Sequence, residues 1–125
     1  MYSLLLVPMD GAPFTKMINA LEKESRVALD RAASGADALA ALKDKPADLV
    51  VAAEQLGDMS GLEFAGKLVA LNPMVNCALV SALDDSDFHE ASEGLGILVQ
   101  LPPDPDESGA AELLQKLDKI KGFEA

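Results

Sequence analysis

The chain has 125 residues, half of them apolar, and a formal net charge of −11 at pH 7. This length suffices for one buried core, so the sequence predicts a single domain over residues 1–125. The charge argues against a nucleic-acid partner, because phosphate binding needs clustered Lys and Arg, and against anionic membrane surfaces. It favours a partner with a basic surface, while simple solubility is the alternative explanation of the same charge.

Apolar runs and amphipathic segments alternate along the whole chain. Strands are expected at 3–7, 26–32, 48–53, 75–81 and 97–101. Helices are expected at 13–24, 34–45, 62–71, 84–93 (short and acidic) and 107–121, with a loop at 57–61. Five strands alternating with five helices predict an α/β fold, a doubly wound five-stranded parallel sheet with helices on both faces.

No segment indicates export or membrane insertion. The first apolar stretch, 4–7, is too short for a signal peptide or a membrane span, and Met1 favours a true N-terminus. Cys77 is the single cysteine and lies in an apolar run, so a buried, inert thiol is expected. The cytoplasm is therefore the expected compartment.

In open α/β sheets, functional groups gather beyond the carboxyl ends of the strands. The residues expected there are Pro8, Met9, Asp10, Ala53, Glu54, Ser81, Ala82, Leu101 and Pro102. The chain has no Gly-rich phosphate loop and no Ser/His/Asp or Cys/His set, so we expect neither catalytic residues nor a cofactor.

Several segments resemble the receiver domains of response regulators. PADLVVAAEQLGDMSGLEF (46–64) resembles their central stretch, and ASGADAL (33–39) their second-helix opening. VSA (80–82) and EGLGILVQLP (93–102) resemble the fourth and fifth strands. The resemblance runs from about residue 3 to residue 120 and implies the flavodoxin-like strand order 2-1-3-4-5.

The resemblance also implies a phosphorylation site, and most of that site is missing. A receiver accepts a phosphoryl group on an Asp after its third strand, beside a Mg²⁺ held by an acidic pair after the first. A Ser or Thr and a Lys then contact the phosphoryl oxygens. In this chain, Pro8 and Met9 replace the acidic pair, Ala53 the acceptor and Leu101 the lysine. Ser81 alone is kept, and we interpret it as a structural hydrogen-bond donor.

An alternative remains open, in which the receiver is phosphorylated at a non-standard residue, because two carboxylates lie close to the expected site. Asp10 comes near the site after a one-residue slip, although it is interpreted as a loop residue that starts the first helix. Glu54 follows Ala53, but alternation of strand side chains directs it elsewhere. The sequence therefore predicts a pseudo-receiver without a metal, fixed in one conformation.

With this chemistry gone, function is expected on the surface. In receivers, the fourth helix, fifth strand and fifth helix dock kinases, other regulators or output domains. Here that face is expected to comprise Asp84, Asp85, Asp87, Glu90, Glu93, Leu98 and Asp104. Leu98 stands where many receivers carry a switching aromatic residue. We therefore predict phosphorylation-independent binding of a signalling protein with a basic surface.

Two other interpretations remain open. The acidic segment can be a solvated, poorly packed helix in which His89 is incidental. Alternatively, the chain is a flavodoxin-like binder of a small apolar ligand, with a mouth formed by Pro8, Met9, Ala53 and Leu101.

Overall fold

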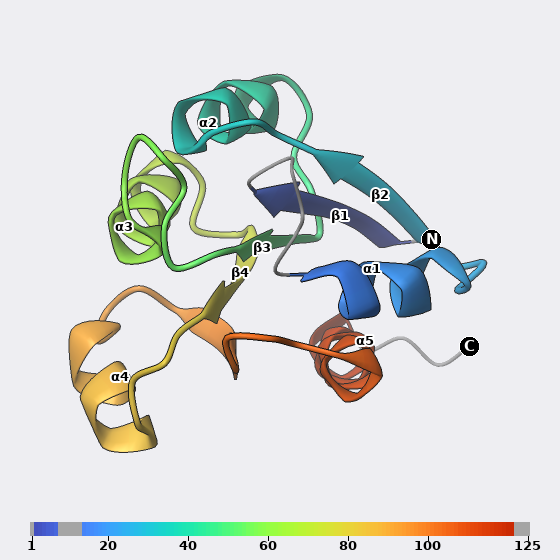
Figure 1. Cartoon of the computed structure of the whole chain (residues 1–125). Coiled ribbons are helices and arrows are strands. Elements are labelled where there is room, and N and C mark those ends of the chain that lie inside the picture. Colours follow the sequence, from blue (N-terminus) through green and yellow to red (C-terminus); the bar gives the residue numbers. More distant parts are fainter. Residues whose placement is uncertain (1, 8–13, 122–125) are drawn as a thin grey trace.

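A computed structural model of the chain describes residues 2–7 and 14–121. Strands and helices alternate through these residues (Figure 1). The strands are β1 (Tyr2–Val7), β2 (Val27–Arg31), β3 (Leu49–Ala52), β4 (Asn76–Val80) and β5 (Ile97–Leu101). The helices are α1 (Thr15–Glu22), α2 (Gly35–Asp44), α3 (Gly61–Leu71), α4 (Asp85–Ala91) and α5 (Glu107–Lys121).

The strands form one parallel sheet in the order β2-β1-β3-β4-β5, which confirms the predicted fold class and strand order. Helices α1 and α5 cover one face, α2 and α3 cover the other, and α4 stands beside the β5 edge (Figure 1). Every residue of β3 is buried, as is expected for a strand covered on both faces. The largest fully buried side chains come from the sheet and from both helical layers: Phe14, Phe64, Leu4, Leu6, Met17, Leu21, Leu49, Leu68, Leu79, Leu101, Leu113 and Leu117.

Element boundaries differ from the predictions by at most two residues, and capping explains the clearest case. The acidic helix begins at Asp85 rather than Asp84, because the Asp84 carboxylate accepts a hydrogen bond from the Asp87 amide at 2.8 Å as the N-cap. The third strand ends at Ala52, so Ala53 already belongs to the following loop. Pro13, the predicted start of the first helix, lies outside the described residues. No helix in residues 2–7 and 14–121 has the length and apolar character needed to cross a bilayer.

A polar cluster joins α5 to the amino ends of β1 and β2. The Tyr2 hydroxyl donates to Asp118 Oδ1 at 2.6 Å, and Arg26 Nη1 donates to the same oxygen at 3.1 Å. The Arg26 guanidinium also lies over the Tyr2 ring, 5.8 Å from its centroid. The hydrogen bond from Tyr2, followed by that from Arg26, lowers the pKa of Asp118 below its ordinary value of 3.8. Ionised Asp118 thus stabilises the folded chain.

Asp118→Asn should therefore remove an acid-dependent part of the stability. The stabilisation from an acid whose pKa is lowered on folding is present above the unfolded-state pKa and is lost as the pH falls through the folded-state value. Urea unfolding from about pH 6 to about pH 3 should show that the difference in free energy of unfolding between parent and variant shrinks as the pH falls below 3.8. Glu112→Gln, an exposed position on α5, is the control. A gap that does not change with pH would contradict the assignment.

Candidate functional site

The carboxyl ends of the central strands place the predicted site residues at one edge of the sheet. Ala53 follows β3, Ser81 follows β4, and Leu101 is the last residue of β5. The Ala53 amide donates to the carbonyl of Val7, and the Ser81 amide donates to that of Leu101, both at 3.0 Å. These three residues are therefore held near the same edge.

Three of the predicted site residues, Pro8, Met9 and Asp10, lie outside the described residues. The expected apolar mouth of the cleft is consequently tested only at Ala53 and Leu101. Both are buried, with 6 % and 0 % of their surface exposed. Neither residue lines the two hollows, described below, that open at this edge.

Ser81 is buried and has a structural role. Its hydroxyl accepts a hydrogen bond, whereas the sequence had suggested a hydrogen-bond donor. Its Oγ accepts a hydrogen bond from the Leu83 amide at 3.2 Å, which closes a tight turn at the start of the β4–α4 loop. Within the described part of the chain, no buried side-chain nitrogen or oxygen lacks a hydrogen-bond partner. The hydroxyl therefore stabilises its own loop.

Glu54 is exposed and reaches across from β3 to β4. Its Oε2 accepts a hydrogen bond from the amide of Ala82 at 2.9 Å, and its own carbonyl accepts one from the Gly61 amide at 2.8 Å. Ala53 is buried and Glu54 is exposed, although both lie in the loop that follows β3. The carboxylate is thus engaged by a backbone amide of the neighbouring loop.

Asp58, in the loop between β3 and α3, makes a structural contact that the sequence pattern did not indicate. Its Oδ1 and Oδ2 accept hydrogen bonds from the amides of Gly35 and Ala36, each at 3.0 Å, at the first turn of α2. These two backbone hydrogen bonds lower the pKa of Asp58. An ionised Asp at the amino end of α2 also interacts favourably with the helix dipole, so this loop is fixed to α2.

Among the described residues, the carboxylates at this edge are not grouped in a way that could hold a cation. No group of three or more His, Cys, Asp or Glu side chains is placed there to hold a metal ion. Cys77 is buried in β4, and burial raises the pKa of its thiol to about 12. Asp10, the remaining predicted carboxylate, lies outside this part of the chain.

Two hollows open at the carboxyl edge. One of about 220 Å³ lies between α3 and α4 and is lined by Glu54, Leu62, Leu79, Leu83 and Phe88, among others. It is smaller than the roughly 300–1,000 Å³ of typical ligand pockets. The other, of about 390 Å³, is lined mainly by the β4–α4 loop, Gln100 and Pro102.

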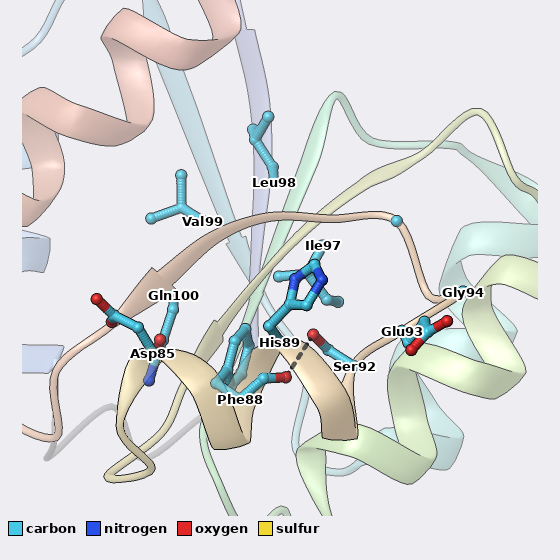
Figure 2. A pocket seen from close by; sticks show the side chains of 11 residues that line it. Asp85, Phe88, His89, Ser92, Glu93, Gly94, Ile97, Leu98, Val99 and Gln100 are labelled. Atoms are coloured by element: carbon cyan, nitrogen blue, oxygen red, sulfur yellow. Dashed lines mark hydrogen bonds between the residues drawn. The ribbon is translucent and has the colours of Figure 1, made fainter.

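A larger groove of about 460 Å³ separates α4 from β5. Figure 2 shows His89 on the helix beside Ile97 on the strand, whereas the Leu98 side chain extends from the strand away from the helix. Phe88 is the one buried side chain of α4, and Leu98 is half-buried at a bulge in β5. Of the predicted partner face, Asp85, Glu93 and Leu98 line this groove, whereas Asp84, Asp87, Glu90 and Asp104 are exposed without lining it.

The family model for the response regulator receiver domain matches residues 7–102. This chain belongs to the response regulator receiver domain family. Receiver domains are signalling modules that interact with kinases or output domains in two-component systems. The family match thus confirms the resemblance seen in the sequence.

Solved structures of receiver domains share the fold. A CheY-like receiver domain from Methanospirillum hungatei JF-1 superposes with a TM-score of 0.82 at 22% identity, covering 99% of both chains. The receiver domain of the response regulator NarL from Mycobacterium tuberculosis gives 0.78 at 20% identity, covering 97% of both chains. None of the curated proteins matches this receiver domain in sequence.

The start of α3 packs tightly against the end of β3. Substitution of two glycines of that helix can test this close packing. A Cβ at Gly61 would clash with the carbonyl oxygen of Ala53, whereas a Cβ at Gly66 would meet only Leu95 Cδ2 at 3.9 Å. Gly61→Ala should lower the free energy of unfolding by about 1–3 kcal/mol through overpacking. Gly66→Ala should raise it by up to about 1 kcal/mol through helix propensity. Chemical denaturation measures both, and equal effects would contradict the close approach.

Proposed function

We propose that this receiver domain acts without aspartyl phosphorylation, by binding a signalling protein at the groove between α4 and β5. It does so as one domain over residues 1–125, in the cytoplasm, with neither metal nor cofactor and without nucleic acid. The observation that carries the proposal is Ala53, whose buried methyl group stands directly after β3. A methyl group offers no oxygen for phosphoryl transfer.

The neighbouring side chains support the same conclusion. Leu101 is fully buried and offers no cation to a phosphoryl group. The Ser81 hydroxyl and the Glu54 carboxylate already accept hydrogen bonds from the amides of Leu83 and Ala82. A phosphoryl group on Glu54 would have to break the Ala82 contact and would gain no lysine at the end of β5 in exchange. The edge is thus better suited to holding its own loops than to phosphoryl transfer.

Phosphorylation can be tested directly with a small phosphodonor or beryllofluoride plus Mg²⁺. We expect no added mass on the intact protein, and no amide shifts at Ala53 or Ser81, because the acceptor carboxylate is absent. A receiver domain that retains its acidic pair, Asp and Lys serves as the positive control. Stoichiometric, Mg²⁺-dependent modification of Glu54 or Asp10 would instead establish a non-standard phosphorylation site and overturn the proposal.

The groove has the chemistry of a site for a basic, partly apolar segment of a partner. Its wall combines the apolar Phe88, Ile97 and Leu98 with carboxylates such as Asp85 and Glu93. No Lys or Arg occurs between residues 68 and 115, so one sign of charge dominates this side of the chain. Such a surface speeds the approach of a positively charged partner and repels acidic ones.

Reversing one groove charge should separate groove binding from general acidity. Glu93→Lys should weaken binding of a histidine kinase or regulator partner by roughly tenfold without phosphodonor, and added salt should weaken parent binding. Asp44→Lys changes the charge equally at an exposed position at the end of α2 and should leave the affinity near that of the parent. Titration by calorimetry measures both. Equal losses for the two variants, or binding only after phosphodonor treatment, would contradict the proposed site.

A further inference from the structure

The β4–α4 loop is held by one side chain from the β3–α3 loop and one from β5. From the β3–α3 loop, Glu54 Oε2 accepts the hydrogen bond from the Ala82 amide at 2.9 Å. From β5, Gln100 Nε2 donates to the carbonyl of Leu83 at 2.8 Å and to that of Ser81 at 3.3 Å. One side chain accepts and the other donates, so the two bind complementary backbone groups of the same short loop.

The position of α4 depends on this loop, because the helix itself has little buried surface. Phe88 is its one buried side chain, and the helix has seven residues. Asp84, the residue after the clamped segment, is the N-cap of α4. A displacement of the loop would therefore move the first turn of the helix.

Phe88 connects the loop to the groove. It lines both the groove between α4 and β5 and the hollow between α3 and α4, so it separates the two. Gln100 also lines the groove while it holds Leu83. A shift of α4 would therefore change the width and the apolar floor of the groove.

We propose that Glu54 and Gln100 form a clamp that fixes α4 and so keeps the groove preformed in the unmodified protein. They act as positioning residues, through the Ala82 amide and the Leu83 carbonyl. Only the purpose of the groove rests on the proposed function; the clamp itself is a property of the free chain. A preformed surface avoids the cost of ordering at the moment of binding, which favours an interaction that needs no phosphorylation.

Two isosteric exchanges between acid and amide distinguish the clamp from polar side chains that lie on the surface without fixing the loop. Gln100→Glu removes both donors and sets a carboxylate against two carbonyl oxygens, so the clamp should open. Glu54→Gln keeps an acceptor oxygen for the Ala82 amide, so the clamp should persist. Glu54→Ala, which removes the acceptor, is a second variant that should open it. Gln115→Glu, exposed on α5, controls for the added negative charge.

Amide hydrogen exchange of the free protein is the readout. The amides of Phe88 and Ser92 are bonded inside α4, each at 2.9 Å, and exchange when the helix opens locally. Gln100→Glu and Glu54→Ala should each speed their exchange by about tenfold, as expected from losing one or two hydrogen bonds. Glu54→Gln and Gln115→Glu should leave it near the parent rate. Amides of β3, such as Val51, should keep the parent rate in all four variants, showing that the sheet remains folded.

The outcomes separate this inference from the proposed function. Unchanged exchange at Phe88 and Ser92 in both Gln100→Glu and Glu54→Ala would overturn the clamp, whatever the groove binds. Faster exchange in Glu54→Gln as well as in Glu54→Ala would also overturn it, because the charge and not the acceptor would then matter. Faster exchange in the two opening variants alone supports the clamp. If partner affinity then stays at the parent value, the clamp stands and the groove fails as the partner site.

Discussion

The structure depends on burying both faces of its central strands. Helices cover β1, β3 and β4 on both faces of the sheet. The buried positions of these strands are filled by apolar residues such as Leu4, Val50 and Leu79. A side chain that needs water or a charged partner cannot be accommodated in such strands without a large penalty. Polar chemistry is consequently confined to the residues that follow the strands, and parallel pairing brings those residues to one edge.

At that edge, this chain uses its carboxylates and amides to tie loops together. Asp58 binds the first turn of α2, Glu54 binds the amide of Ala82, and Gln100 binds the carbonyl of Leu83. Each hydrogen bond contributes only about 0.5–1.5 kcal/mol, but together they connect α2, the β3–α3 loop, the β4–α4 loop and β5 in series. Small contributions in series suffice to select one arrangement of loops that have few buried side chains of their own.

The sequence predicted the sheet and the family because both depend on apolar patterning, which is local and strong. Strand 49–52 is an uninterrupted apolar run, and its burial follows from that run alone. The hydrogen bonds between side chains and neighbouring loops at the carboxyl edge were not predictable in this way. Gln100 reads as one polar residue in an edge strand, and Asp58 as one acid in a loop. Their partners are backbone groups of other loops, whose positions no periodicity encodes. Ser81 is a similar case, since a structural role was expected for its hydroxyl but the Leu83 amide, from which it accepts a hydrogen bond, was not.

The acidic character of α4 acquires a physical role from its place beside an edge strand. In strand β5, Ile97 and Leu98 are both half-buried, and Phe88 is the one buried side chain that the short helix contributes. Half-exposed apolar residues on an edge strand invite pairing with another copy of the chain. The carboxylates that line the groove, Asp85 and Glu93, oppose that pairing, since two identical faces would bring like charges together. Under the proposed function, the same charges that disfavour self-association would attract a partner with a basic surface.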